Sequence, residues 1–425
     1  MKNKQPALLM LALRGLTRNR RRSLVTFLAI MLGYAGISLF AGYTHNIYRG
    51  LELQAIHGEL LGHLTVQKPG MSREGKLDPE RYMLNGDEIE RIRAIASENQ
   101  HVRLVAPRMT ISGLLSNGRV STIFVAEGIQ PEAARQLRQG LAVVPALAAS
   151  RNVAGGGVET LDADNRDTVA IANGLAGLMK LDVGDTGAVL VNTLGGQANA
   201  SDIVVGGIFN TGNASTNDLA AFMPLELVRY LYDAEGRADR LSLLLDDTGS
   251  TAVARADLEK RFADAGLALE IQSWDELSSV YRQVREMFNM IFGFIFLIVL
   301  TVVAMSVINS MGMAVVERTR EIGTLRAIGL RQRGVTRLFT SEAGLLLVIG
   351  CGVGFAVTMA VRAIVNAAGI SYVPPNQVAA VPLLIDMDER MIVAAVVLAV
   401  VGLLAALIPA RRAAHQPIIN ALGHV

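Results

Sequence analysis

The chain has 425 residues with a net charge of only +2, and 51% of its residues are hydrophobic. Its mean hydropathy of +0.37 is too high for an ordinary soluble protein. Charged residues make up 18% of the chain, which is too large a share for a bundle of membrane spans alone. The single cysteine, Cys351, excludes a disulfide framework within the chain.

Four uncharged stretches follow one another along the chain. They contain no Asp, Glu, Lys or Arg and cover residues 23–44, 287–316, 343–361 and 391–410. Crossing a bilayer takes roughly 20 mostly apolar residues in a helix, so each stretch is long enough to span. One span, a long polar region and then three spans indicate an integral membrane protein with one large extramembrane module.

Basic residues gather beside these stretches on one side only. Residues 1–22, 317–340 and 411–412 are rich in Lys and Arg, whereas the link before the last span ends in acidic residues. Lys and Arg near span ends stay in the cytoplasm. Both termini are therefore predicted to be cytoplasmic, and residues 45–285 and 366–390 to lie outside.

The N-terminal segment allows other interpretations. A basic run at 20–22 could bind nucleic acid, but its position directly before a span favours a topological role, and no nucleic-acid partner is predicted. The apolar region of a cleaved signal peptide has about 7–15 residues, and the stretch 23–44 is longer, so we expect an uncleaved anchor. Residues 1–22 then form a basic amphipathic helix against the membrane lipids.

The long polar region has the pattern of a mixed α/β module. Runs rich in β-branched residues predict strands at 63–67, 109–115, 120–127, 168–172, 187–191, 203–209 and 241–245. Helical periodicity predicts helices at 86–97, 131–139, 225–232 and 251–265. Asn117-Gly118 predicts a tight hairpin, and glycine-rich segments at 155–157 and 195–201 predict exposed loops.

The module is predicted to stand on two stalk helices. A capping-box sequence at 273–276 starts a helix. Apolar residues that include Trp274, Leu277 and Val284 continue it into the second span, so one helix is expected from about 274 to 316. This helix would be about 60 Å long, roughly twice the thickness of the hydrocarbon layer, so part of it would extend outside the membrane. The helix of the first span is expected to extend outside the membrane in the same way. The alternative is that the extra helix only packs on the module.

The sequence offers no convincing catalytic site. It lacks the glycine-rich loop ending in Gly-Lys-Ser/Thr that cradles nucleotide phosphates. His57 and His63 could share a face, but no cysteine or carboxylate cluster joins them, so no metal site is predicted. The chain is therefore expected to bind no cofactor and to catalyse no reaction itself.

A more informative pattern follows the second span. Its charged residues are Glu317, Arg318, Arg320, Glu321 and Arg326, and its apolar strip comprises Ile322, Leu325 and Ile328. Pairs at i,i+3, Glu317 with Arg320 or Arg318 with Glu321, would stabilise a short helix. A helix with apolar ridges and charges suits docking into a groove on a soluble partner. A solvated loop, the alternative, needs no ordered strip.

This segment resembles the coupling region of the FtsX-like permease family, the MacB-type membrane subunits of ABC transporters. The resemblance continues through Glu342 and through the C-terminal motif at 409–414. Segments 172–176 and 181–185 are similar to the family's periplasmic core element. Trp274-Asp275 and the missing fused ATPase resemble the lipoprotein-releasing LolC/LolE branch, whereas the Arg-rich coupling helix is closer to MacB.

The resemblance implies a mechanotransmission permease. A separate cytoplasmic ATPase, which binds ATP and Mg, would dock on the coupling helix and move the spans, and two permease copies or paralogues would share two ATPases. The cargo would be a lipoprotein or another amphiphile in the outer leaflet of a bacterial inner membrane. Alternatives are MacB-like efflux of peptide, toxin or drug with a periplasmic adaptor, FtsX-like signalling to a cell-wall hydrolase, and a receptor.

The predicted fold is membrane α-helical, with four transmembrane helices and an inserted periplasmic α/β (α+β) domain on two stalk helices. In chain order the segments are a basic cytoplasmic helix (1–22), the first span (23–44), the MacB-like domain with its stalks (45–285), the second span (286–316), the coupling helix and loop (317–340), the third span (341–365), a short periplasmic loop (366–390), the fourth span (391–410) and a cytoplasmic tail (411–425).

Overall fold

The chain divides into two compact units, which we call the membrane unit and the module. The computed structural model describes residues 20–75, 78–140, 152–373 and 380–418. The membrane unit comprises Met1–Tyr48, Val284–Ile370 and Leu383–Val425, and the module comprises Arg49–Gln283 and Ser371–Pro382. Most of the amphipathic helix expected at 1–22 lies outside the described residues.

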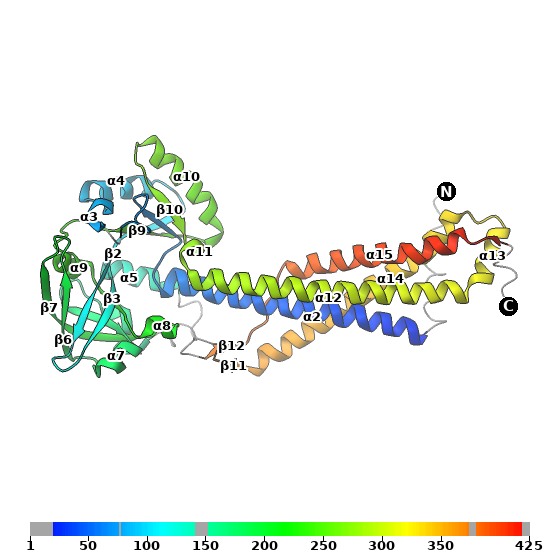
Figure 1. Cartoon of the computed structure of the whole chain (residues 1–425), viewed down its shortest axis with the longest axis horizontal. Helices are drawn as coiled ribbons and strands as arrows, with labels where there is room; N and C mark the ends of the chain where they lie inside the picture. Colours follow the sequence, from blue (N-terminus) through cyan, green and yellow to red (C-terminus); the bar gives the residue numbers. More distant parts are fainter. Residues whose placement is uncertain (1–19, 76–77, 141–151, 374–379, 419–425) are drawn as a thin grey trace. The chain divides into compact units, whose positions relative to one another are not determined.

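Four long helices form most of the described part of the membrane unit (Figure 1). They are α2 (Arg20–Leu53), α12 (Ser279–Glu317), α14 (Gln332–Ala368) and α15 (Arg390–His415). Each is long and apolar enough to cross a membrane, and each contains one of the predicted spans. Their common core includes Ile30, Val307, Leu347 and Leu398, one residue from each helix.

Glycine residues bring α14 close to α2. Gly350 and Gly354 are four residues apart, the spacing at which small residues let two membrane helices approach. A Cβ atom added to Gly350 would lie 2.6 Å from Ile30 Cγ2, and one added to Gly354 would lie 2.8 Å from the carbonyl oxygen of Met31. No side chain fits at these distances. Gly352, by contrast, has no neighbouring atom within 4 Å among the described residues.

Six strands in the described part of the module pair into a closed ring. In order of pairing they are β2 (Val102–Ser116), β3 (Ser121–Ile129), β8 (Ala220–Pro224), β5 (Thr168–Ala172), β7 (Ala198–Phe209) and β6 (Thr186–Asn192). The β3–β8 and β5–β7 pairs are parallel, and the others are antiparallel. Because β6 pairs with both β7 and β2, each strand of the ring has a partner on both sides.

The ring surrounds and adjoins apolar cores that helices complete. Met109, Phe124 and Val189 belong to a core that also contains residues of α7 (Asn173–Met179) and α9 (Leu225–Tyr232). Apart from the sheet described below and its helices, the described elements of the module are α3 (Pro79–Tyr82), α5 (Pro131–Gln139), α8 (Ala214–Asn217), α11 (Trp274–Leu277), β4 (Asn152–Ala154), β11 (Ser371–Tyr372), β12 (Val381–Pro382), η1 (Gln54–Gly58), η3 (Gly157–Thr160) and η4 (Thr248–Ser250).

An antiparallel sheet extends from the ring because the first half of β2 has a different partner. The strands, in order, are β2, β9 (Arg240–Leu245), β1 (Leu64–Gln67) and β10 (Glu270–Ser273). The helices α4 (Gly86–Ser97) and α10 (Thr251–Asp264) bury Ile92 and Phe262 in a common core with this sheet. β2 therefore belongs to both parts of the module.

Each strand and helix predicted within the module coincides with an observed one. In the predicted hairpin, the Asn117 side chain accepts hydrogen bonds from the backbone N–H groups of Arg119 and Val120 at 2.9 and 2.8 Å. Both loop predictions were wrong in part. Residues 198–201 belong to β7, because they continue its antiparallel pairing with β6, and Gly157 is buried at the start of η3. The short strands β4, β8 and β10 were not predicted.

The prediction of one continuous helix from 274 to 316 was also wrong. α11 ends before Ser278, whose backbone is extended (φ −72°, ψ 98°), and α12 begins at the next residue. The Ser278 hydroxyl accepts a hydrogen bond from the Tyr281 N–H at 3.3 Å, which provides α12 with a side-chain cap. The capping box at 273–276 is confirmed, but it starts only α11.

Candidate coupling site at the corner between α12 and α13

The segment after α12 folds into a separate short helix, α13 (Thr319–Ala327). The chain turns at Arg318, whose backbone leaves helical geometry (φ −106°, ψ 14°). The Thr319 hydroxyl donates a hydrogen bond to the Val315 carbonyl at 3.0 Å, which satisfies an acceptor of the last turn of α12. Gly329 ends the segment with φ +108°, a conformation that side chains disfavour.

Ion pairs connect this corner to neighbouring helices of the membrane unit. Arg318 Nη1 lies 3.2 Å from Glu342 Oε2 of α14, and the two side chains are only 14% and 4% exposed. Arg22 Nη1 of α2 lies 2.8 Å from Glu317 Oε1. The sequence pattern predicts ion-pair partners within the segment itself. Glu342 and Arg22 instead lie on α14 and α2, and no spacing in the sequence identifies them as partners.

The structure separates the three residues of the predicted apolar strip. Ile322 is 3% exposed and belongs to the core of the membrane unit. Leu325 and Ile328 are 42% and 79% exposed. Ile322 therefore fixes α13 to the membrane helices. Of the predicted strip, only Leu325 and Ile328 are exposed enough to contact a partner.

The charged residues of α13 also differ in their surroundings. Arg320 and Glu321 are exposed, whereas Arg326 is half-buried and its Nη1 donates a hydrogen bond to the carbonyl of Gln416, just beyond α15. α13 is thus held to α14 by Arg318 and to the end of α15 by Arg326. Its exposed surface combines two apolar side chains with two charged ones.

The three residues predicted to lie on a stalk occupy two helices. Trp274 of α11 is 6% exposed and packs in the module beside Ala55 and Ile56. Its ring also contacts that of Tyr281, with centroids 4.6 Å apart. Leu277 is half-buried in α11, and Val284 is half-buried in α12.

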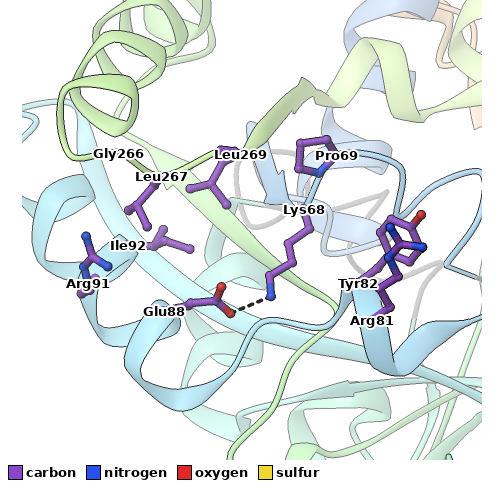
Figure 2. Close-up of a pocket in the computed structure, with 11 residues that line it drawn as sticks. Lys68, Pro69, Arg81, Tyr82, Glu88, Arg91, Ile92, Gly266, Leu267 and Leu269 are labelled. Carbon is purple, nitrogen blue, oxygen red and sulfur yellow. Dashed lines mark ion pairs between the residues drawn. The ribbon is translucent and has the colours of Figure 1, made fainter.

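A pocket of about 460 Å³ lies in the module (Figure 2). It is lined by Lys68, Pro69, Arg81, Tyr82, Glu88, Arg91, Ile92, Gly266, Leu267, Ala268 and Leu269. Lys68 Nζ lies 2.9 Å from Glu88 Oε2, and Arg91 donates a hydrogen bond to the Ala265 carbonyl at 3.2 Å. Since these cations are already engaged and the described lining includes no histidine, cysteine or serine, the pocket shows no catalytic arrangement.

His57 and His63 are close together, as their positions in the sequence suggested, with ring centroids 6.1 Å apart. Each ring already makes a hydrogen bond. His57 Nδ1 lies 2.7 Å from the Leu137 carbonyl oxygen, and His63 Nδ1 accepts from the Leu245 N–H at 3.1 Å. Within the described ranges, no group of three or more His, Cys, Asp or Glu residues could hold a metal ion.

Two family models match the chain, and together they cover its membrane helices and its inserted α/β domain. The model for the MacB-like periplasmic core domain matches residues 23–261, and that for the FtsX-like permease C-terminal region matches residues 293–418. The chain belongs to the FtsX/MacB/LolC type of ABC transporter permease. Its membrane helices and periplasmic-type domain fit a bacterial inner membrane protein.

Relatives resemble the chain over different lengths. The lipoprotein-releasing system transmembrane protein LolC of Neisseria meningitidis is 25% identical over 97% of this chain and 98% of its own length. The macrolide export ATP-binding/permease protein MacB of Hahella chejuensis is 32% identical over 36% of this chain and 22% of its own length. The crystal structure of the periplasmic region of MacB from Actinobacillus actinomycetemcomitans aligns with 54% of this chain and 95% of that one, at 16% identity and a TM-score of 0.36.

Proposed function

We propose that this chain is the permease subunit of a mechanotransmission ABC transporter. A separate cytoplasmic ATPase, which binds ATP and Mg, docks on α13 and moves the membrane helices, and stalk-like extensions of α2 and α12 transmit this motion to the module. One observation carries the proposal: Leu325 of α13 and its C-cap residue Ile328 are exposed, and the base of this helix is fixed by the Arg318–Glu342 pair. Exposed apolar side chains on a charged, anchored helix suit a groove on a soluble partner.

The distribution of basic residues supports the orientation of the proposed transporter. Arg21 and Arg22 lie at the start of α2, Arg320 lies on α13, and Arg411 and Arg412 lie near the end of α15. Positive residues near the ends of spans remain cytoplasmic. Both termini and α13 are then cytoplasmic and the module is periplasmic, with the chain crossing the inner membrane four times.

The cargo that we favour is a lipoprotein or another amphiphile in the outer leaflet. The relative that matches over 97% of the chain is a lipoprotein-releasing protein, whereas the match to the macrolide exporter covers 36%. Two permease subunits, identical or paralogous, would act with two ATPases. MacB-like efflux through a periplasmic adaptor and FtsX-like signalling to a cell-wall hydrolase are the competing outputs.

The docking proposal is tested by the double substitution Leu325→Asp with Ile328→Asp. Truncating or charging a central apolar contact costs about 2 kcal/mol or more, so we expect the affinity for the ATPase to fall by at least about 30-fold. Thr324→Asp with Ala327→Asp is the matched control, because it adds the same two charges at exposed positions of α13 and keeps Leu325 and Ile328. Ile322→Asp is unsuitable, since it would place a charge in the core of the membrane unit.

Affinity would be measured by copurification and by titration of the purified ATPase against the permease in detergent. Unchanged affinity of the double variant, with the helical content of the permease intact, would show that α13 is not the docking site.

The cargo is tested with the reconstituted permease–ATPase complex. Lipoprotein transport predicts that an acylated protein stimulates ATP hydrolysis and that its unacylated form does not. Stimulation by a small drug or peptide alone would replace this proposal with efflux. Stimulation by a purified cell-wall hydrolase alone would favour the signalling role.

A further inference from the structure

The end of α2 enters the module through an unusual turn. After Leu53 the helix widens into the π-helix η1, and the next residues reverse the chain into β1. Leu60 has φ +59° although it is not glycine, and it is fully buried. Gly62 has φ +71°, and a Cβ atom there would lie 2.7 Å from the Leu243 carbonyl oxygen. A buried non-glycine residue in this conformation is strained and persists only where its surroundings fix it.

One such constraint on the turn is the side chain of Arg108. This arginine lies on β2 and is 1% exposed, and its Nη1 donates a hydrogen bond to the Leu60 carbonyl oxygen. Its Nη2 lies 3.0 Å from Glu127 Oε2 on β3. A single guanidinium therefore connects the turn after α2 to two strands that also form part of the closed ring.

Glu127 is shared with a second arginine that does not reach the turn. Arg240 of β9 is opposite Arg108 in the sheet register, and it pairs with Glu127 and, at 2.9 Å, with Asp239. Burial favours the neutral form of Glu127, but the attraction of Arg240 and Arg108 outweighs it, and the pKa of Glu127 is lowered. Glu127 is thus ionised, whereas burial raises the pKa of Asp239. The two arginines differ because Arg108 contacts Leu60 and Arg240 pairs with Asp239.

Stability alone gives little reason for this arrangement, because a buried ion network is often no more stable than apolar residues of the same size. Arg is suited to a different task, since its planar group makes several hydrogen bonds in fixed directions. Here one arm holds a backbone carbonyl of the turn while the other holds a carboxylate of the sheet.

We propose that Arg108 is a positioning residue that locks the turn after α2 to the sheet, so that displacement of α2 moves β2 and β3 rather than deforming the turn. This inference rests on the proposed mechanotransmission function. It assigns Arg108 a role in transmission, and assigns Arg240 the role of keeping Glu127 charged. Arg108→Met and Arg240→Met therefore form a matched pair, because each removes one cation from the same network.

The first test is hydrogen exchange of the full-length protein in detergent. In the Arg108→Met variant, we expect backbone amides of residues 59–63 to exchange about tenfold faster, which corresponds to loss of one charge-assisted hydrogen bond. In the Arg240→Met variant, the exchange rate of the same amides should change by less than about threefold. Arg108→Lys, which keeps the charge but lacks the second arm, is the variant to use if Arg108→Met does not fold. Equal exchange at 59–63 in both methionine variants would overturn the proposal.

The second test compares the permease–ATPase complex with and without ATP and vanadate. In the wild-type complex, trapping the ATPase should change the exchange of β2 and β3. In Arg108→Met that change should be largely lost while ATP hydrolysis continues, and in Arg240→Met it should remain. A full response in Arg108→Met would refute the role of Arg108. If the wild-type complex itself shows no response, the mechanotransmission function is wrong, whatever the variants do.

Discussion

Two arginines, the half-buried Arg318 in the membrane unit and the buried Arg108 in the module, can be compared in very different surroundings. Arg318 lies where α12 ends, Arg108 contacts the turn after α2, and each pairs with a carboxylate. Arg318 shares Glu342 with no other cation that the structure identifies in the described chain, whereas Arg108 shares Glu127 with Arg240. An isolated pair and a redundant network should respond differently when one member is removed.

The surroundings explain why the two arrangements differ. The membrane unit presents apolar side chains at its surface, such as Met290 and Phe294, which are 77% and 66% exposed, as expected of helices solvated by lipid. Such helices offer few polar groups from which to assemble a network. In the module, the sheet register brings Thr110 opposite Glu127 and Arg108 opposite Arg240, so charges accumulate side by side.

The largest effect should come from breaking the isolated pair. Arg318→Met leaves Glu342 buried without its cation, and we expect a loss of about 3 kcal/mol in the free energy of unfolding, measured by titration with denaturing detergent. Arg318→Met combined with Glu342→Leu should recover most of it, because both charges are then gone. Arg108→Met should cost less, since Arg240 remains beside Glu127. Equal losses for Arg318→Met and Arg108→Met would remove the distinction between the two sites.

A smaller loss should follow from overpacking the helix contact of the membrane unit. Gly354→Leu places a side chain against Met31 of α2, and a cost of about 2 kcal/mol is expected, seen as a lower denaturation midpoint in mild detergent. The control Gly352→Leu lies two residues away, where a Cβ atom meets no described atom within 4 Å. If both leucine variants lower the midpoint alike, the close contact between α2 and α14 is not what they disturb.

The smallest effect should be a pH dependence carried by His63 in the module. Burial and the neighbouring His57 lower its pKa to about 4, although Asp246 and Asp247 act in the opposite direction. Protonation would also oppose the hydrogen bond that His63 Nδ1 accepts from the Leu245 N–H.

Because the unfolded chain binds this proton near pH 6.5 and the folded chain only near pH 4, the stabilisation is complete above pH 6.5. It is lost as the pH falls from there toward 4. Lowering the pH from 7 to 5.5 should therefore cost about 1 kcal/mol, measured by chemical unfolding at each pH. His63→Gln, which can still accept from Leu245, should show a flatter profile. An equally steep profile in that variant would assign the effect to other groups.

The sequence predicts what local patterns encode. The alternation of apolar residues and the Asn117-Gly118 turn were sufficient for the strands and hairpin of the module, and charge-free runs identified the four helices. The break at Ser278 was missed because a capping box and continuous apolar spacing both favour a helix there. The burial of Ile322 depends on how α13 packs against the other helices, which its own periodicity does not specify.

The partners in the charged sites could not be predicted from local sequence patterns either. Arg318 and Glu342 are separated by more than a span's length of the chain, and Glu127 and Arg240 by more than a hundred residues. Only the fold brings such residues together. Leu325 and Ile328, in contrast, lie in and directly after a helix short enough for the sequence to show their pattern.

The pairing of β1 with β10 constrains the order in which the protein can fold as it is made. Leu64, just after α2, is the register partner of Ser273, just before α11, so nearly the whole module must be synthesised before this pair can form. Contacts so distant in sequence form slowly because a long loop must close first. During synthesis, α2 is therefore available to the membrane long before this sheet is complete, and the nascent module must remain soluble until β10 has been made.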